Sequence, residues 1–318
     1  MTTVSERRTM KTRFTEKSSG FCGLLSEIPG KKEAAILLMN DDGPDDFLSK
    51  IGMKWLNGMG LAAMAVGPEK SRKGLHSWPL ENVENAVQYL RSIGYKKTGI
   101  CGVSAGSNMA LSAAARIPDI TLTIAMTPMD WVYWGYCHDG ADGASERPTE
   151  GESAYTWRGK PLPWMPAPWN HPDYWKQIRE ESKRRGDKAA GLDFHQLAED
   201  KHPLTDEIMI PIEAIRGRLL LAGAEDDVVW DTCRAIRRMQ KRLEEKGSSR
   251  YEVLTYRHCS HFIFPESMLR LILPGFLIDR ILPLVFKETK GFVKECRESR
   301  VDLDRHIRET IRAWRAGG

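Results

Sequence analysis

Short apolar runs alternate with segments of helical periodicity over the first part of this chain. We predict strands from the apolar runs at residues 34–39, 61–66, 98–103 and 122–126. Between them, apolar residues recur at helical spacing over residues 48–56, 80–93 and 108–116. Strands that lack polar alternation and are separated by helices are typical of a mostly parallel sheet with helices on both faces. This pattern places the chain in the α/β class.

The alternation stops between residues 136 and 206, a stretch rich in Trp, Pro, Gly and charge. It resumes with a predicted strand at 218–222, a helix at 231–246, a strand at 251–255 and helices to the end. An insertion with many aromatic side chains needs a surface to pack on, so we interpret it as a cap. The expected organisation is an N-terminal extension with a hairpin (1–30), a core (31–135 and 207–318) and a cap or lid (136–206).

Six of the ten tryptophans lie in or just before this cap: Trp131, Trp134, Trp157, Trp164, Trp169 and Trp175. Aromatic side chains that cover the edge of a sheet are suited to enclosing an apolar ligand. We therefore name Trp131, Trp164 and Trp169 as candidate substrate-binding residues. The alternative is that these side chains only attach the cap to the sheet.

Composition limits the partners and the location. A formal net charge of +4 on 318 residues is too small to indicate nucleic-acid binding. The basic first 20 residues are not followed by an apolar segment, and residues 268–286 are apolar but interrupted by charges and prolines. We expect no signal peptide and no membrane span. Residues 268–286 are expected to pack on the cap or to form a homodimer surface.

The six cysteines are scattered and show no metal-binding or redox spacing. Reduced thiols in a cytoplasmic protein are the expectation. Basic residues at 70–73 and 183–185 either meet the phosphates of a coenzyme A derivative or form solvated surface.

The motif Gly102-Val103-Ser104-Ala105-Gly106 stands between a predicted strand and a predicted helix. In that context it is typical of a sharp turn that exposes a nucleophilic serine, with glycines where a side chain would clash. The N–H of Ala105 then faces the oxyanion that develops during acyl transfer, and the helix dipole adds to its effect. The sequence therefore predicts Ser104 as a nucleophile.

A nucleophilic serine in this fold is followed along the chain by an acid and then by a histidine. Asp226 and Asp227 follow the predicted strand 218–222, and either one fits the acid position. His258 and His261 follow the strand 251–255. We favour His261 as the base because small residues flank it and an apolar run follows; His258 is the second choice.

The loop after the first parallel strand is expected to supply the second oxyanion donor. Backbone N–H groups at Asp41 and Asp42 are the candidates. Asp45 and Asp46 follow closely, but the spacing is not that of an EF-hand, and such residues usually cap the next helix. We expect neither a metal site nor a cofactor.

Four segments resemble one family: residues 102–135, 155–163, 210–217 and 225–232. They are similar to the C-terminal catalytic domain shared by acyl-CoA thioesterases and bile-acid-CoA:amino-acid N-acyltransferases. This family is an α/β-hydrolase branch close to dienelactone hydrolase, and the resemblance covers roughly residues 30–265. It implies an α/β-hydrolase fold and makes Asp227, the second aspartate of the pair before Trp230, the triad acid. The family's thioesterases use serine and its animal amidating enzymes use cysteine, so Ser104 resembles the hydrolytic side.

The resulting expectation is a serine hydrolase that cleaves acyl thioesters through Ser104, Asp227 and His261. The same triad also serves a carboxylesterase, lactonase or amidase, or acyl transfer from coenzyme A to an amine. A non-enzymatic binding scaffold would lack one of the three residues, whereas here each position has a candidate.

Overall fold

One eight-stranded sheet organises the computed structural model, which describes residues 9–70, 74–137, 152–168 and 171–317. From one edge to the other its strands are β1 (Met10–Phe14), β2 (Gly23–Glu27), β4 (Ala62–Val66), β3 (Ala34–Met39), β7 (Lys97–Val103), β8 (Ile120–Met126), β12 (Arg218–Ala224) and β13 (Tyr251–Tyr256). Strand β2 runs antiparallel to both of its neighbours, and the remaining pairs are parallel. The predicted α/β class with a mostly parallel sheet is confirmed.

The central strands are buried on both faces, as their unbroken apolar character predicts. Ile36 and Leu37 are neighbours on β3 and point to opposite faces of the sheet, yet neither is exposed. Ile36 belongs to one hydrophobic core and Leu37 to the other. Such a strand needs a helical layer on each side.

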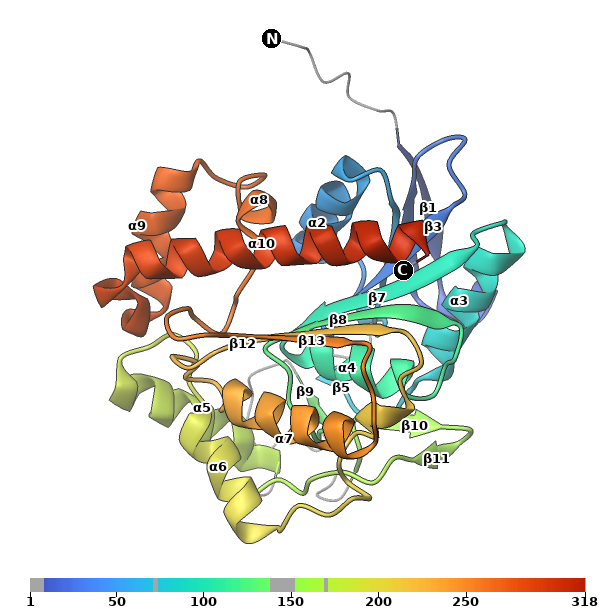
Figure 1. Ribbon diagram of the computed structural model, residues 1–318. Helices are drawn as coiled ribbons and strands as arrows, with labels where there is room; N and C mark the ends of the chain where they lie inside the picture. The colour runs from blue at the N-terminus through green and yellow to red at the C-terminus, as the bar shows by residue number, and fades with distance from the viewer. Residues whose placement is uncertain (1–8, 71–73, 138–151, 169–170, 318) are drawn as a thin grey trace.

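The two helical layers are α2 (Phe47–Gly58), α8 (Glu266–Leu269) and α10 (Val293–Ala316) on one face, and α3 (Glu81–Ser92), α4 (Ala105–Ala114) and α7 (Thr232–Glu245) on the other. Figure 1 shows α10 lying along one face of the sheet, with α4 and α7 on the opposite side. Helix α7 is strongly amphipathic: Ile236, Met239 and Leu243 are buried, whereas Arg237 and Lys241 are exposed.

The N-terminal strands β1 and β2 are antiparallel, as expected of a hairpin, and the short helix α1 (Glu16–Ser19) connects them. They do not stand apart from the sheet, because β2 also pairs with β4. The N-terminal segment therefore widens the sheet at its antiparallel edge. Its treatment as a separate extension stays a prediction.

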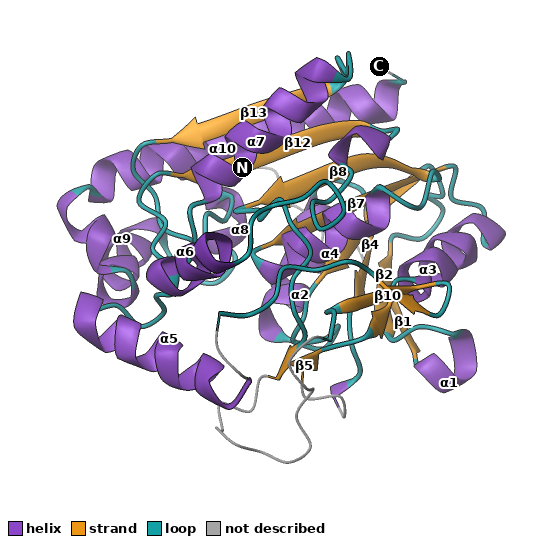
Figure 2. Cartoon of the chain, turned by 90° about the horizontal axis from the view of Figure 1, so that it is seen from below, coloured by secondary structure: helices purple, strands orange, loops and turns teal. Residues whose placement is uncertain are grey.

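The segment between β8 and β12 contains β9 (Tyr136–Cys137), β10 (Tyr155–Trp157), β11 (Lys160–Pro161), α5 (His171–Arg185), α6 (Leu192–Lys201) and the 3-10 helix η2 (Ile212–Ala214). Strand β9 pairs with β5 (Gly74–Leu75), and β10 pairs with β6 (Trp78–Pro79). In Figure 2, α5 and α6 lie together at one end of the molecule. The boundaries of the cap at 136 and 206 stay a prediction.

A buried ion cluster attaches α6 to the core. Arg238 on α7 donates to both carboxylate oxygens of Asp130, each at 2.6 Å, and to Glu199 on α6 at 3.0 Å. Asp130 is fully buried, and burial raises its pKa although Arg238 opposes the shift. Planar guanidinium forks suit this bidentate arrangement.

The apolar stretch 268–286 forms the end of α8 and the helix α9 (Gly275–Val285), followed by the 3-10 helix η3 (Lys287–Gly291). Ile278 and Phe286 are buried, whereas Phe276 and Leu284 are 65% and 72% exposed. Its expected role in cap packing or dimerisation stays a prediction. In the described parts of the chain, no helix combines the length and apolar character needed to cross a membrane.

A buried ion pair holds α8, α9 and α10 together. Arg300 on α10 is 2% exposed and donates to Glu266 at 3.0 Å and to Asp279 at 3.2 Å. Glu266 also accepts from Arg270, and Asp279 from Arg297. Removing the central guanidinium would leave two buried carboxylates with only peripheral partners.

We predict that Arg300→Met lowers the free energy of unfolding by about 3 kcal/mol, since breaking a buried pair strands its charges. The matched control is Arg305→Met on the same helix, whose side chain is 52% exposed and pairs with Asp302. That variant should lose much less stability, because water and salt screen an exposed ion pair. Urea unfolding followed by circular dichroism measures both. An equal loss of unfolding free energy in the two variants would show that the buried ion pair stabilises the protein no more than the exposed one.

Candidate active site

The turn between β7 and α4 carries Ser104 in a backbone conformation that only special turns adopt, with φ 56° and ψ −128°. A Cβ atom on Gly102 would lie 2.0 Å from the carbonyl oxygen of Gly106, and one on Gly106 would lie 2.3 Å from that of Met39. Both glycines are therefore required for strand, turn and helix to approach this closely. The Ser104 N–H donates to the Met126 carbonyl at 3.0 Å, which fixes the turn to the neighbouring strand.

The loop after β12 holds the Asp227 carboxylate in a buried cage of donors. Its oxygens accept from the N–H of Val229 at 2.9 Å, from the N–H of Trp230 at 3.3 Å and from the hydroxyl of Thr232. The remaining donor is His261 Nδ1, 2.8 Å from Oδ2 and 3.0 Å from Oδ1. Asp227 is 3% exposed, so these bonds replace the water it lost on burial.

His261 lies between this carboxylate and the serine and is 1% exposed. Its Nε2 atom is 2.7 Å from Ser104 Oγ. A carboxylate only accepts, so Nδ1 carries the proton, and Nε2 is left to accept from the serine hydroxyl. Trp230 meets the imidazole edge to face at 4.7 Å and limits its rotation. The structure thus brings together the predicted nucleophile, acid and base.

The alternative acid and base pair with each other. His258 Nδ1 is 2.8 Å from Asp226 Oδ2, and its ring stacks on Phe292 at 3.6 Å. Asp226 and Asp227 are adjacent in sequence, and each bonds a different histidine of the same loop. Of the two pairs left open by the sequence, Asp227 and His261 lie at Ser104, and Asp226 and His258 bond each other instead.

The candidate oxyanion donors differ in their surroundings. Ala105 is the first residue of α4, so its N–H has no acceptor within the helix. The Asp42 N–H donates to the Asn40 side chain at 3.0 Å, a local turn that occupies the donor expected to face the substrate. The Asp41 carboxylate accepts from the Tyr136 hydroxyl at 2.8 Å. Both aspartates lie at the mouth of the cavity beside Ser104.

The other aspartates of this loop serve local structure. Asp46 caps α2 by accepting from the Leu48 N–H at 2.7 Å, and Asp45 pairs with Arg13. The Arg13 guanidinium holds the pKa of Asp45 below its ordinary value. Within the described residues, no group of three or more His, Cys, Asp or Glu side chains is placed to hold a metal ion.

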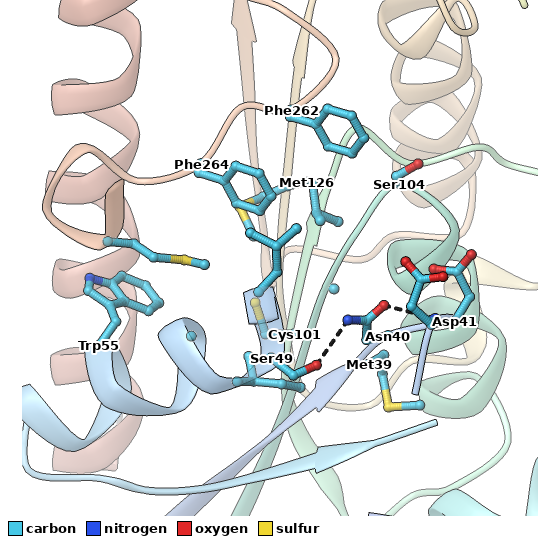
Figure 3. A pocket seen from close by; sticks show the side chains of 17 residues that line it. Met39, Asn40, Asp41, Ser49, Trp55, Cys101, Ser104, Met126, Phe262 and Phe264 are labelled. Carbon is cyan, nitrogen blue, oxygen red and sulfur yellow. Dashed lines mark hydrogen bonds between the residues drawn. The ribbon is translucent and has the colours of Figure 1, made fainter. Parts of the chain in front are cut away.

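A cavity of about 230 Å³ opens beside Ser104 (Figure 3). It is lined by the ends of β3, β7 and β8, by α2 and α8, and by the loop that follows His261. The apolar part of this lining could not be predicted from the sequence. The one available signal was Gly52 in the middle of a predicted helix, where glycine costs about 1 kcal/mol relative to alanine.

Two of the three tryptophans proposed to bind substrate, Trp131 and Trp164, can be located in the structure. Trp131 is fully buried, stacks on Trp134 at 5.6 Å and donates from Nε1 to Glu199 at 3.0 Å. Trp164 is partly buried against the same core. Neither lines the cavity beside Ser104. Trp169 lies outside the described residues.

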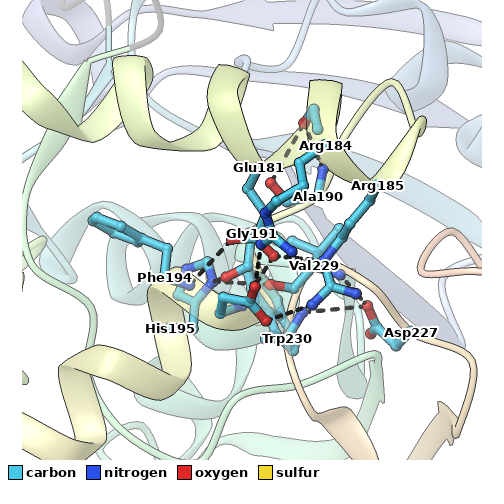
Figure 4. Close-up of polar contacts among 12 residues, drawn as sticks. Glu181, Arg184, Arg185, Ala190, Gly191, Phe194, His195, Asp227, Val229 and Trp230 are labelled. Carbon is cyan, nitrogen blue, oxygen red and sulfur yellow. Dashed lines mark hydrogen bonds and ion pairs between the residues drawn. The ribbon is translucent and has the colours of Figure 1, made fainter.

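The basic cluster 183–185 is partly engaged in ion pairs. Arg184 and Arg185 both pair with Asp193 on α6, and Arg185 also bonds Glu181 at 2.9 Å (Figure 4). Residues 71–73 of the other basic run lie outside the described residues. The predicted contact with coenzyme A phosphates stays a prediction.

A histidine that the sequence analysis did not single out ties the cap to the acid loop. His195 on α6 lies near Val229 and Trp230 of that loop in Figure 4. Its Nδ1 is 2.6 Å from the Gly191 carbonyl and 2.9 Å from the Val229 carbonyl, and Nε2 bonds the Tyr133 hydroxyl. Burial lowers its pKa to about 4. His195 therefore stays neutral, with the proton on Nδ1.

Comparison with known families matches residues 175–268 to the family described as BAAT / Acyl-CoA thioester hydrolase C terminal. The matched region includes Asp227 and His261, and the resemblance inferred from the sequence is confirmed over it. No curated protein matches the chain.

Two solved structures illustrate the fold. The acylaminoacyl peptidase of Pyrococcus horikoshii is 10% identical with a TM-score of 0.53, and the match covers 98% of this chain and 42% of that one. Carboxyl esterase 2 of the fungus Tuber melanosporum is 15% identical with a TM-score of 0.49, covering 91% and 88%. The present chain thus spans less than half the length of the peptidase. The fold is that of the α/β-hydrolases, and the family match supports an enzyme of the hydrolase type.

We predict that acid lowers the free energy of unfolding of this protein through protonation of His195. The unfolded chain protonates this histidine below pH 6.5, whereas the folded protein does not until about pH 4, so the free energy of unfolding falls as the pH falls through this window. The contribution is about 3 kcal/mol. Urea unfolding between pH 7 and pH 4 should therefore show a smaller pH-dependent loss for His195→Gln than for the wild type. Parallel curves for the two proteins would contradict the assignment.

Proposed function

We propose that this protein is a serine hydrolase that cleaves acyl thioesters. The observation that carries the proposal is the continuous hydrogen-bond chain from Asp227 through His261 to Ser104 Oγ. In such a chain the imidazole removes the serine proton as the hydroxyl attacks a carbonyl carbon, and the buried carboxylate stabilises the imidazolium that forms.

The negative charge that develops on the substrate oxygen needs donors aimed at it. The Ala105 N–H at the start of α4 is one candidate, and the helix dipole favours an anion there. The loop after β3 is the proposed source of the second donor. Within it the N–H of Asp41 is the candidate, because the N–H of Asp42 already donates to the Asn40 side chain. Removing one such donor typically costs a hundredfold to a thousandfold in rate.

The intermediate then collapses and its C–S bond breaks. His261 gives its proton to the leaving sulfur, so a thiol departs and an acyl group remains on Ser104. Water deprotonated by His261 attacks this ester and releases the acid. Every group in these steps belongs to the chain, the substrate or water, so the proposal includes no cofactor.

Thioesters are preferred over oxygen esters in this proposal because the family matched over residues 175–268 is described by thioester hydrolysis. Hydrolysis is preferred over transfer to an amine because of the serine nucleophile and the family pattern it resembles. A panel of acyl-CoA, nitrophenyl ester and amide substrates, with glycine as an added amine acceptor, tests these preferences directly.

We predict that Ser104→Ala abolishes covalent labelling by a fluorophosphonate and lowers kcat for acyl-CoA hydrolysis by about 10³-fold or more, since the attacking atom is gone. Ser112→Ala is the matched control, because Ser112 lies on α4, is fully buried and has a hydroxyl without a hydrogen-bond partner among the described residues. Mass spectrometry of the labelled protein measures the first effect. Full labelling of Ser104→Ala would refute the nucleophile assignment.

The paired aspartates provide a second prediction. Asp227→Asn should lower kcat by about 10⁴-fold, because an amide no longer holds the imidazole in the required tautomer. Asp226→Asn makes the same carboxylate-to-amide change at the adjacent residue. It should leave kcat within about threefold of the wild-type value, because its partner His258 does not contact Ser104. Steady-state kinetics on one acyl-CoA compares them. A larger loss in Asp226→Asn would reverse the assignment.

A further inference from the structure

The cavity beside Ser104 extends toward α2, and none of the described residues that line it belongs to the segment 136–206. In Figure 3, Ser104 lies at one side and Trp55 at the opposite side, with Phe262, Phe264 and Met126 between them. Its volume is about 230 Å³. A group attached to the serine oxygen can therefore continue into the core of the protein on the α2 face of the sheet.

The walls of this cavity are apolar and tightly held. Cys101, Met126, Phe264 and Met268 are each less than 9% exposed. The indole nitrogen of Trp55 is occupied, because Nε1 donates to Ser267 Oγ at 2.9 Å. Trp55 thus contributes an apolar wall, and its indole N–H needs no acceptor on a ligand.

The polar groups of the lining bond one another. Ser49 Oγ accepts from the Asn40 side chain at 2.9 Å and donates to the Gly43 carbonyl at 3.3 Å. Among the seventeen described residues that line the cavity, none is Lys, Arg or His, and the two charged ones are Asp41 and Asp42. A neutral hydrocarbon is favoured by this surface, and a buried carboxylate would find no cation there.

Gly52 keeps the far end open. It lies in the interior of α2, and a Cβ atom there would approach Leu38 Cδ1 to 3.0 Å and Met268 Cε to 3.8 Å. A side chain at this position would therefore project into the cavity from the helix. The absence of one explains a glycine where the helix itself would gain from alanine.

Given the function proposed above, we propose that this cavity, and not the tryptophan-rich cap, binds the acyl chain of the substrate and selects uncharged chains of medium length. An apolar cavity of roughly 150 Å³ holds the six carbons of benzene, so by proportion this one holds an acyl chain of about eight or nine carbons. A fused-ring acyl group such as a steroid exceeds that space.

The first test is the chain-length profile with saturated acyl-CoA substrates from two to sixteen carbons. We expect kcat/KM to rise about fourfold per methylene up to about eight carbons and then to fall. Suberoyl-CoA, which has eight carbons and a terminal carboxylate, should be at least about a hundredfold poorer than octanoyl-CoA. A flat profile, or equal rates for these two substrates, would overturn the proposal.

The second test fills the cavity. Gly52→Val should shift the optimum by at least about two carbons toward shorter chains, so that kcat/KM falls more for octanoyl-CoA than for butyryl-CoA. The matched control is Gly58→Val on the same helix, where an added Cβ meets no atom within 4 Å. Its profile should equal that of the wild type. If Gly52→Val does not fold, as judged by its thermal transition, Gly52→Ala takes its place with a smaller shift.

Trp164→Ala distinguishes the cap from the cavity. Under the proposal it leaves the chain-length optimum where it was. If Trp164→Ala moves the optimum and the Gly52 variants do not, the acyl chain binds under the cap and the proposal fails.

A binding experiment separates this inference from the proposed function. In Ser104→Ala, which cannot form an acyl-enzyme, calorimetry should show affinity rising about fourfold per methylene from butanamide to octanamide. Gly52→Val in that background should weaken octanamide about tenfold or more. Such binding without Ser104-dependent thioester hydrolysis would refute the function and support the cavity. Ser104-dependent hydrolysis with a profile insensitive to Gly52→Val would do the reverse.

Discussion

The Asp227 carboxylate is the point at which the loop after β12, the loop after β13 and the start of α7 are joined. Its two oxygens receive donors from all three, and the protein buries the charge only because these donors are present. The position of His261 depends on this arrangement, and the hydrogen bond to Ser104 depends on His261. The strained turn at Ser104 is held independently, by the close contacts of Gly102 and Gly106 with their neighbours.

Much of the fold follows from the sequence because it depends on local pattern. The predicted strand 34–39 coincides with β3, since an apolar run of that length can be satisfied only inside a sheet covered on both sides. The positions of Ser104, Asp227 and His261 could also be predicted, because each follows a strand of the sheet and the carboxyl ends of parallel strands meet along one edge. The pairing of Asp226 with His258 could not be predicted, because two adjacent aspartates have the same local pattern.

Other features depend on contacts between distant segments. Trp131 looked like a ligand-facing residue, but it is buried by Trp134 and fixed by Glu199 from α6. His195 gave no signal in the sequence, because its role comes from the carbonyl of Val229, 34 residues away. The cavity joins residues from near position 40 with residues near 265, and only the folded chain brings these together.

The attachment of α6 has a mechanical consequence for how a substrate reaches the serine. The carbonyl of Val228 accepts from the N–H groups of Gly191 and Leu192, both at 3.0 Å, directly beside the bond from His195 to Val229. A hinge motion of α6 away from the sheet would pull on the same few residues that position Asp227. Helix α6 therefore holds the acid loop in position. For a substrate to enter without disturbing Asp227, the parts of the chain that move must be ones that do not bond this loop.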